Sequence, residues 1–587
     1  MNGEHTITRK EKAKEMNNQQ VAQVFNTLAD MLEIQGEVIY KILAYRRAAE
    51  NIASLTRDIN ELQRQGQLRT ISGVGEAIAE KLDALLTTGS FDLLDRARAE
   101  VPAGVVELLR VQDVGPRKAK LFWKELGITS IAALEAAARE GKLRGLPGMG
   151  AKSEAKLLAN IEAFKRRASD TRMPLGVAFP LSQSILHELM QVPSVLRAAS
   201  AGSLRRMKET IGDLDFLIAA REAELVMERF VSLPVVAEVI ARGPTKSSVR
   251  LTNGAQADLR VLEPERWGTA LQYFTGSQAH NVRLREIAQK KGLSLNEYAI
   301  TREKDGKEIL CAEEAEVYRT LGLPLIPPEL REDRGEFERD IPELVTADDL
   351  LGDLQMHTTW SDGKASVEEM ARGAQARGYR YILITDHTQS LGVAGGLTPE
   401  RSKKQRQEID AVNARLKGIR VLHGAEVEIL ADGTLDFSDE VLASLDIVMA
   451  ALHTGLRQER DKATARMLSA IRNLHVDIIA HPSGRLIGER DGADLDLEAI
   501  LKAAAETRTI LEINAHPSRL DLSDLNARRA IEMGCKLSIG TDAHEAQGFD
   551  VMFYGVAVAR RAWATKEDVV NTWPLDRLLR WVRERRG

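Results

Sequence analysis

Two aspartates separated by one residue, Asp213 and Asp215, lie in the apolar run IGDLDFLIAA. On an extended strand, side chains at positions i and i+2 face the same side. Two carboxylates held together repel unless divalent cations lie between them, which is what two-metal phosphoryl transfer requires. Asp258, in QADLRV, is expected to add a third carboxylate from a neighbouring strand. The alternative is a surface strand with solvated acids, which the apolar flanks and the upstream Gly-Ser disfavour.

Gly202 and Ser203 precede this aspartate pair in AGSLRRMKETIGDLDF. At a turn, they can present an N–H and a hydroxyl to phosphate oxygens, and Arg206 adds positive charge. The sequence therefore predicts a site that binds an anionic phosphate ester beside a metal-dependent centre.

Eight of the eleven histidines follow residue 348, and most come directly after an apolar, strand-like run. The residues placed in this way are His357, His387, Glu426, His453, His481, His516 and His544. In a barrel of parallel strands, the C-terminal strand ends converge on one mouth. A cluster of imidazoles and carboxylates there would be costly without cations, and neutral His with Asp or Glu suits Zn²⁺, Mn²⁺ or Fe²⁺. One such histidine could be a satisfied core residue, but the whole set predicts a metal centre.

A glycine-containing pattern occurs three times near the N-terminus, in ISGVGEAIAEKL, VQDVGPRKAKLF and LPGMGAKSEAKLL. A glycine at a hairpin tip lets backbone N–H groups approach a phosphate, and the following helix N-terminus adds partial positive charge. A single copy could be an ordinary capped helical turn, whereas three copies indicate helix-hairpin-helix contacts to a DNA backbone. The glycines predicted to bind DNA are Gly73, Gly75, Gly115, Gly148 and Gly150.

The elements that must position these groups change in character along the chain. Residues 20–165 show helical spacing of apolar residues, and residues 175–265 contain short β-branched runs. After residue 348, apolar strands alternate with amphipathic helices, which favours a parallel α/β barrel. Six strands are expected there: YRYILIT, IRVLHG, DIVMAAL, VDIIA, TILEIN and KLSIG. The Pro- and charge-rich segment before them is interpreted as a linker.

Composition sets outer limits on the class of protein. The length of 587 residues predicts several domains. No apolar run approaches the roughly 18 residues of a membrane span, and the N-terminal segment lacks a signal-peptide core and is expected to be a frayed tail. Two distant cysteines fit a reducing, cytoplasmic compartment and argue against a disulfide framework or a thiolate metal site. The net charge of −5 neither predicts nor excludes a nucleic-acid partner.

The Gly202–Ser203 turn, the three aspartates and the segment YFTGSQAHNVRL together resemble the pattern of family X DNA polymerases, and the resemblance covers residues 20–325. The resemblance implies a nucleotidyltransferase palm in which Asp213, Asp215 and Asp258 hold two Mg²⁺ or Mn²⁺ ions. It also places a group of residues around the incoming nucleotide. Gly202, Ser203, Arg206 and Gly276 are expected near the triphosphate, and Tyr273, Phe274 and Asn281 along the sugar and base.

The same resemblance implies a lyase pocket in the N-terminal helices, where a lysine forms a Schiff base with an abasic sugar. The matching residue is Lys81, with Lys41 and Tyr45 at other positions of the pocket. Another lysine of the family's pocket is replaced by Ala77. A lysine on a helix surface remains the alternative interpretation of Lys81.

The C-terminal pattern resembles the PHP (polymerase and histidinol phosphatase) domain over residues 349–565. The resemblance implies Mn²⁺- or Zn²⁺-dependent phosphodiester cleavage, with ligands at His357, Asp362, His387, Glu426, His453, His481, Asp542 and His544. Gln355 replaces a ninth ligand, a histidine, so one of three metal positions is expected to bind less tightly. The resemblance implies that this is the position shared by His357, Glu426 and Asp542, and His516 is a possible substitute.

We therefore expect a multidomain α/β chain: an N-terminal all-helical helix-hairpin-helix region, an α+β palm and thumb, and a C-terminal distorted (β/α) barrel. The expected domains are 1–97 (helical, lyase-like), 98–170 (helix-hairpin-helix fingers), 171–265 (palm), 266–325 (thumb), 326–348 (linker) and 349–587 (PHP).

The predicted function is gap-filling DNA synthesis in repair with a 3′–5′ exonuclease. The expected partners are gapped or primer-template DNA and dNTPs, with no membrane, for a monomeric protein. Two alternatives are a phosphoesterase whose polymerase half mainly binds DNA, and a non-catalytic DNA-binding scaffold. Intact aspartates and YFTGS argue against the first alternative, and the metal-type ligands argue against the second.

Overall fold

A computed structural model describes residues 16, 18–53, 59–71, 73–111, 113–169 and 172–587. The N-terminal tail expected over the first residues lies outside this part of the chain. The chain divides into two compact units, Met1–Thr171 and Arg172–Gly587. Among the described residues, none of the helices combines the length and the apolar character needed to cross a membrane.

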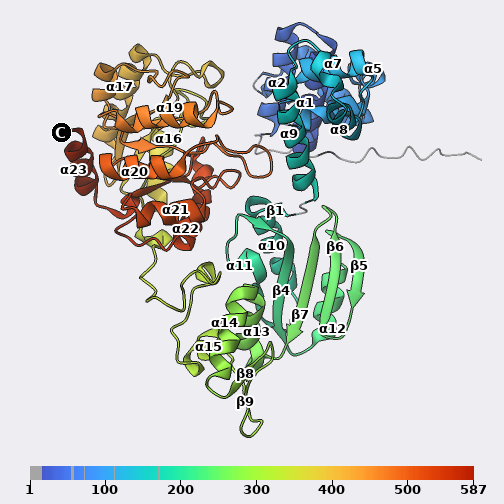
Figure 1. Ribbon diagram of the computed structural model, residues 1–587, viewed down its shortest axis with the longest axis vertical. Coiled ribbons are helices and arrows are strands. Elements are labelled where there is room, and N and C mark those ends of the chain that lie inside the picture. Colours follow the sequence, from blue (N-terminus) through green and yellow to red (C-terminus); the bar gives the residue numbers. More distant parts are fainter. Residues whose placement is uncertain (1–15, 17, 54–58, 72, 112, 170–171) are drawn as a thin grey trace, which may run out of the picture. The chain divides into compact units, whose positions relative to one another are not determined.

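The first unit is helical throughout its described residues, as predicted (Figure 1). Buried aliphatic and aromatic side chains, among them Phe25, Leu82 and Phe122, form its core. Its helices are α1 (Asn18–Gln35), α2 (Ile39–Ala53), α3 (Ile59–Arg64), α4 (Glu76–Thr88), α5 (Asp92–Glu100), α6 (Ala103–Glu107), α7 (Pro116–Leu126), α8 (Ile131–Arg139) and α9 (Ala151–Ser169).

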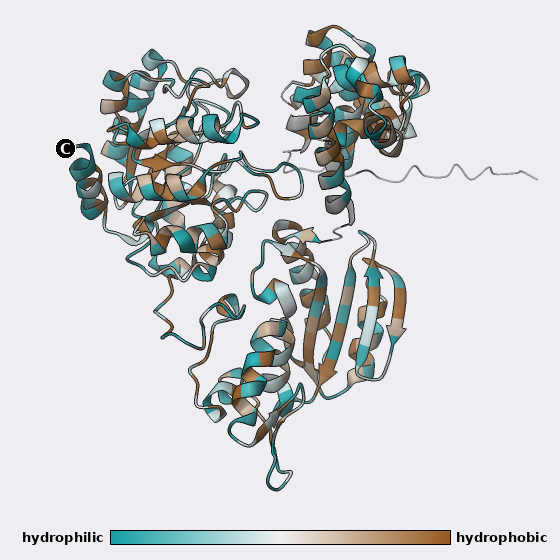
Figure 2. Cartoon of the chain, viewed as in Figure 1, coloured by the Kyte–Doolittle hydropathy of each residue, from teal (hydrophilic) through white to brown (hydrophobic). Residues whose placement is uncertain are grey.

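The second unit begins with a five-stranded sheet in the order β2-β4-β7-β6-β5. Its strands are β2 (Val195–Ser200), β4 (Asp213–Ala220), β5 (Val236–Arg242), β6 (Lys246–Leu251) and β7 (Gln256–Leu262). Only β4 and β7 pair in parallel. The helices α10 (Leu175–Met190) and α12 (Ala223–Val231) supply apolar side chains to the same core as the sheet. Hydrophobic colour runs along β4 and also along the edge strand β5 (Figure 2).

A small α+β subdomain follows the sheet. It contains α13 (Trp267–Thr275), α14 (Gln278–Gln289), α15 (Glu314–Thr320) and a three-stranded antiparallel sheet of β8 (Leu293–Leu295), β9 (Ile300–Arg302) and β10 (Glu308–Ile309). The segment expected to be a linker has little regular structure, but it is packed. Ile326 and Val345 are buried, and so is the whole side chain of Arg331.

The C-terminal part is a seven-stranded parallel sheet in sequence order, β11 to β17. A single parallel bridge between Met356 and Ala543, just beyond the first and last strands, brings the two edges together, so the sheet forms a nearly closed barrel, as predicted. All six predicted strands are confirmed. The strands are β11 (Gly352–Asp353), β12 (Tyr381–Ile384), β13 (Arg420–Glu428), β14 (Ile447–Ala451), β15 (Ile478–Ile479), β16 (Ile510–Asn514) and β17 (Leu537–Gly540).

Helices alternate with these strands and supply buried apolar side chains to the barrel's outer core (Figure 1). They are α16 (Val367–Ala376), α17 (Pro399–Arg415), α18 (Asp439–Ala443), α19 (Arg460–Arg472), α20 (Leu497–Thr507), α21 (Asp524–Glu532), α22 (Met552–Arg561) and α23 (Leu575–Arg586). Because every strand is buried on both faces, its residues form a continuous apolar run instead of alternating between apolar and polar.

A buried ion network joins the sheet, the subdomain and the packed segment. Arg205, in α11 (Gly202–Arg205), donates from both terminal nitrogens to the carboxylate of Glu314 at 2.8 Å, and Arg331 donates to the same carboxylate at 2.5 Å. Burial alone would raise the pKa of Glu314, but the two guanidinium groups outweigh it and lower the pKa to about 2.

This network predicts a pH-dependent contribution to stability. Because the folded-state pKa of Glu314 is depressed, its contribution is complete above the ordinary pKa and is lost as the pH falls toward 2. Glu314→Gln leaves two buried cations poorly compensated and should cost about 3 kcal/mol at pH 7. Thermal unfolding should show a lower melting temperature for the variant at pH 7 and a smaller difference at pH 3. An equal difference at both pH values would contradict this account.

Candidate active sites and metal centres

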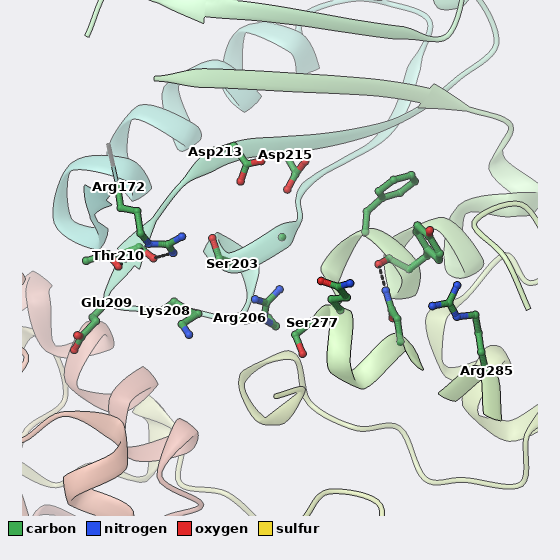
Figure 3. A pocket seen from close by; sticks show the side chains of 16 residues that line it. Arg172, Ser203, Arg206, Lys208, Glu209, Thr210, Asp213, Asp215, Ser277 and Arg285 are labelled. Atoms are coloured by element: carbon green, nitrogen blue, oxygen red, sulfur yellow. Dashed lines mark hydrogen bonds between the residues drawn. The ribbon is translucent and has the colours of Figure 1, made fainter. Parts of the chain in front are cut away.

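A cavity of about 860 Å³ lies beside the N-terminal end of β4. Figure 3 shows Asp213 and Asp215 on one side of it, with Ser203 and Arg206 between them and Ser277. The cavity is lined by Arg172, Gly202, Ser203, Arg206, Lys208, Glu209, Thr210, Asp213, Asp215, Tyr273, Phe274, Gly276, Ser277, Gln278, Asn281 and Arg285. Seven of the predicted nucleotide-site residues, together with two of the three predicted aspartates, therefore line one hollow.

The three aspartates come from the parallel pair β4 and β7. Asp215 is the direct cross-strand partner of Asp258, and Asp213 precedes Asp215 by two positions on the same strand. Burial raises the pKa of Asp215 to about 7, and the neighbouring charges of Asp213 and Asp258 add to this shift. The local potential is therefore strongly negative and suits a divalent cation. Asp258 does not itself line the cavity as described.

Gly202 is required by the close approach of Asp215. Its φ of +59° is one that side chains other than glycine's rarely adopt. A Cβ at this position would lie 2.2 Å from Asp215 Oδ2. The turn that carries Ser203 therefore lies directly against the carboxylate, which explains why a glycine precedes the serine.

Arg206 is held at the mouth of the cavity by two acceptors. Its Nε donates to Glu332 at 3.0 Å, and its Nη1 donates to the carbonyl of Thr275 at 2.5 Å. Gly276 follows with a φ of +65°, and a Cβ there would lie 3.2 Å from Arg206 Nη1. Arg206 and the Thr275–Gly276 turn are thus assembled as one surface.

The aromatic pair lies at the end of α13. The rings of Tyr273 and Phe274 pack edge to face at 5.1 Å, and Arg260 lies over the ring of Phe274 at 4.3 Å. Asn281 donates to the carbonyl of Tyr273 at 2.7 Å and accepts from Gln272 at 2.8 Å. These contacts fix the orientation of the groups expected along the sugar and base.

Three cations of the cavity, Arg172, Lys208 and Arg285, were not predicted from the sequence. Arg172 donates to Thr210 Oγ1 at 3.0 Å, which brings it to the strand before Asp213. Lys208 lies two residues after the predicted Arg206, and this closeness in sequence could have identified it as a residue of the same cavity. Arg172 precedes the sheet by many residues, and nothing in its local pattern marks it.

The predicted DNA-binding glycines open the helices of the first unit. Gly75 and Gly115 cap α4 and α7, and Gly150 directly precedes α9. A Cβ on any of these three would meet no atom within 4 Å, so their backbone is accessible. Gly73 and Gly148 have φ values of +73° and +75°, which the tight turn requires.

The second copy of this motif differs at its tip. Asp113 stands where the other copies have Gly73 and Gly148, and it adopts a φ of +69°. Its carboxylate accepts from Asn160 at 3.0 Å and pairs with Lys156 at 3.2 Å, both on α9. This tip is therefore tied to a neighbouring helix.

The predicted lyase residues are engaged locally. Lys81 donates to the carbonyl of Ala77 on its own helix at 2.7 Å, and Lys41 pairs with Glu37 one turn earlier at 3.2 Å. Tyr45 is buried and packs against Phe25. Among the described residues, no contact links these side chains to an activating group, and the lyase role of Lys81 stays a prediction.

The second candidate centre lies at the C-terminal ends of the barrel strands, around Glu426. Its carboxylate is 1% exposed, and its oxygens lie 2.8 Å from His481 Nε2, 3.2 Å from His387 Nδ1, 3.3 Å from His453 Nε2 and 3.5 Å from His357 Nε2. The rings of His357 and His387 stack at 4.4 Å, and those of His357 and His544 at 4.5 Å. The eight predicted ligands therefore converge, although they span almost the whole barrel sequence.

Two sets of these ligands are already spaced to hold cations. Within the described residues, ligand atoms lie within 4.8 Å of one another in the set His357, Asp362, His387 and His544, and in the set His387, Glu426 and His453. Neither oxygen of Glu426 makes a well-directed hydrogen bond, and Nδ1 of His357, His387 and His481 is likewise unsatisfied. Buried polar atoms left in this state fit coordination to a metal ion.

The charge balance supports the same conclusion. Burial alone would lower the pKa of His357 and His453, but the acids Asp542 and Glu426 outweigh it and raise these values to about 9 and about 10. The neighbouring histidines hold the pKa of Glu426 and Asp542 well below the usual range, although burial alone would raise it. Imidazolium groups thus balance the buried acids here, and divalent cations would take over this role by displacing the imidazole protons when they bind.

A layer of acids behind the ligands was missed in the sequence. Glu428 accepts from Nδ1 of His453 at 2.8 Å and from its backbone N–H, and Glu512 accepts from the backbone N–H of His481 at 2.7 Å. Burial raises the pKa of the inner acid Asp353 to about 7. The available signal for Glu428 was its i+2 spacing from Glu426 on one strand.

Gln355 is fully buried, and its carbonyl oxygen accepts from Asn514 at 3.0 Å. Asn514 also donates to Asp542 at 3.2 Å. The amide is thus engaged within a polar network. His516 is exposed, contacts Ser518 Oγ at 2.7 Å and belongs to neither ligand set. It lines a hollow together with the predicted ligands Asp542 and His544, and its role as a substitute for the missing ligand stays a prediction.

Comparisons with known protein families cover most of the chain. Matches are to a helix-hairpin-helix domain (16–91), a SAM-like helix-hairpin-helix tandem (105–162), the DNA polymerase beta thumb (270–332) and the PHP domain (353–516). The chain is 40% identical over 561 residues to the DNA polymerase/3′-5′ exonuclease PolX of Bacillus subtilis (strain 168), covering 95% of this chain and 97% of that protein.

Shorter relatives match in part. A probable phosphatase of Thermoanaerobacter sp. (strain X514) is 34% identical over 234 residues, covering 37% of this chain and 90% of that protein. A probable phosphatase of Syntrophotalea carbinolica is 28% identical over 229 residues, with 37% and 90% coverage.

The contact between Glu428 and His453 generates a prediction about metal affinity. Glu428 fixes the ring so that Nε2 faces Glu426, and losing such a partner typically costs about 10- to 100-fold in metal affinity. Glu428→Gln should weaken Mn²⁺ binding by about this factor, measured by calorimetric titration. The matched control is Glu368→Gln, which removes a carboxylate from the barrel's outer surface. Equal Mn²⁺ affinity in both variants would contradict the assignment.

Proposed function

The chain belongs to the PolX family of bacterial DNA polymerases, which carry a PHP domain, and on this premise we propose that it extends DNA 3′ ends and also shortens them. The observation that carries the polymerase proposal is the pairing of Asp215 with Asp258 beneath the Gly202–Ser203 turn. The observation that carries the nuclease proposal is the unsatisfied carboxylate of Glu426 among four histidines.

In the polymerase site, Asp213, Asp215 and Asp258 would hold Mg²⁺ or Mn²⁺, which supplies charge neutralisation and activation of the primer 3′-hydroxyl. Arg206 and Ser203 bind the triphosphate, and the Gly276 turn lies beside them in the lining of the cavity. Tyr273, Phe274 and Asn281 orient the sugar and base. The primer 3′-oxygen then attacks the α-phosphate in line, and pyrophosphate leaves toward the cationic side of the cavity, where Arg206 and Lys208 lie.

In the PHP site, the eight ligands would hold Mn²⁺ or Zn²⁺, which supplies a water nucleophile at neutral pH. Glu428 and Glu512 orient His453 and His481. The well-lowered pKa of Glu426 and Asp542 keeps both acids ionised across the physiological range, so they remain available as ligands.

The proposed partners are gapped or primer-template DNA and dNTPs, bound by a monomer that acts in DNA repair in the cytoplasm. The glycine turns of the first unit support DNA binding, because their backbone N–H groups lie open at helix starts. A contact of this kind binds the phosphate backbone and does not depend on the base sequence.

The polymerase proposal predicts that Asp258→Asn lowers gap filling at least about a hundredfold, because one carboxylate charge is lost from the cation site. Single-nucleotide incorporation on a one-nucleotide gap measures this effect. The matched control is Glu238→Gln, on the edge strand β5 with its side chain 65% exposed. Incorporation by Asp258→Asn at the control rate would reject the assignment.

The nuclease proposal predicts that a polymerase-deficient Asp213→Ala protein still shortens a 5′-labelled primer from its 3′ end when Mn²⁺ is supplied. Adding His453→Ala should stop the shortening, because His453 belongs to a cation-spaced ligand set. Denaturing gels over a time course give the readout. Shortening that persists with His453→Ala would place the nuclease elsewhere. A protein that shortens but never extends would favour the phosphoesterase alternative.

A further inference from the structure

The loop that follows the Gly202–Ser203 turn is held from the PHP domain. Residues 206–209 carry Arg206, Lys208 and Glu209 along one side of the nucleotide cavity, and Figure 3 shows these three side chains in a row. Met207, within the loop, adopts a φ of +53°, which is unusual for a side chain other than glycine's. A loop in such a conformation needs outside contacts to maintain it.

Arg561, the last residue of α22, provides one of these contacts. Its Nη1 donates to the backbone carbonyl of Arg206 at 2.6 Å and lies 3.3 Å from Glu332 Oε1. Glu332 is the carboxylate that accepts from Arg206 Nε at 3.0 Å. Arg561 therefore touches Arg206 twice, once directly at its backbone and once through the acid that orients its guanidinium.

Arg561 is itself rigidly placed. Its Nε and Nη2 donate to one oxygen of Asp524, in the first turn of α21, at 3.0 and 2.8 Å. The side chain of Arg561 is 3% exposed, and that of Glu332 is 10% exposed. Hydrogen bonds of charged groups in such sheltered positions are stronger than those at the surface.

A second arginine of the PHP domain holds the other end of the loop. Arg485 donates from Nη2 to the carboxylate of Glu209 at 2.7 Å, and its Nε donates to the carbonyl of Arg519 at 3.0 Å. The loop is thus fixed at Arg206 and at Glu209 by two side chains that belong to the barrel.

We infer that the PHP domain completes the nucleotide site of the polymerase, with Arg561 as a positioning residue that sets the place of Arg206 against the triphosphate. This inference rests on the proposed contact between Arg206 and the triphosphate. It assigns the barrel a role in synthesis that is separate from its own metal centre, since Arg561 belongs to neither ligand set. Loss of Arg561 weakens dNTP binding more than it slows the chemical step.

The test is single-turnover gap filling by the full chain, with the apparent dissociation constant for dNTP and the maximum rate measured separately. Arg561→Ala should raise the dissociation constant about tenfold, the factor that corresponds to one charged hydrogen bond, and change the maximum rate less than threefold. Arg561→Lys, which keeps the charge but not the fork of donors, should show a smaller rise that still exceeds twofold.

The matched control is Arg560→Ala. Arg560 lies next to Arg561 on the same helix and bonds Glu329 at 2.7 Å and the Val345 carbonyl at 3.1 Å, with no bond to Arg206. It should stay within twofold of the unaltered protein. An equal rise in Arg560→Ala and Arg561→Ala, or a rise below twofold in Arg561→Ala, would overturn the inference. If Arg561→Ala melts early, Arg561→Lys decides by the same twofold criterion.

A parallel measurement separates this inference from its premise. Arg206→Ala should raise the dNTP dissociation constant at least as much as Arg561→Ala. If Arg206→Ala has no effect on dNTP binding, the proposed triphosphate contact fails. If Arg206→Ala weakens binding and Arg561→Ala does not, only the role of the PHP domain fails.

Discussion

The cost of holding carboxylates away from solvent is the constraint on which both catalytic centres depend. Asp215 stands between Asp213 and Asp258 with its pKa raised to about 7, and Glu426 stands almost fully buried with neither oxygen in a well-directed hydrogen bond. Acids in such places are costly to maintain unless cations share the site. The folds place them at strand ends, where backbone geometry rather than side-chain packing brings them together.

The two centres differ in the residues that surround their carboxylates. In the palm, Asp213 and Asp215 face an open cavity with no histidine among its described lining residues, and Asp258 pairs with Asp215 from the parallel strand β7. Such a set of aspartates suits hard cations and an anionic substrate that brings its own charge. In the barrel, imidazoles surround the central carboxylate, and a further layer of acids orients them. Such a mixed set suits borderline cations and a water nucleophile. The packed segment before the barrel and the arginines 485 and 561 connect the two sites.

Much of this arrangement could be predicted from the sequence because periodicity carries it. The period of two put Asp213 and Asp215 on one face, and the six apolar runs marked the barrel strands and hence the residues at their ends. Contacts between residues that are distant in the sequence have no such periodic pattern and could not be predicted in this way. Arg172 lines the nucleotide cavity and Arg561 bonds the backbone of Arg206, both from elements distant in the sequence. Gln355 proved to be a partner of Asn514, which the sequence pattern alone did not indicate.

The most direct measurement is anomalous diffraction at the manganese edge from crystals of the full chain grown with Mn²⁺, gapped DNA and a non-hydrolysable dNTP. The account predicts anomalous peaks between the carboxylates of Asp213, Asp215 and Asp258, and separate peaks within the two ligand sets of the barrel. A map with the nucleotide bound but no peak among the three aspartates would contradict it. A barrel without peaks would contradict the assignment of its two ligand sets to metal ions.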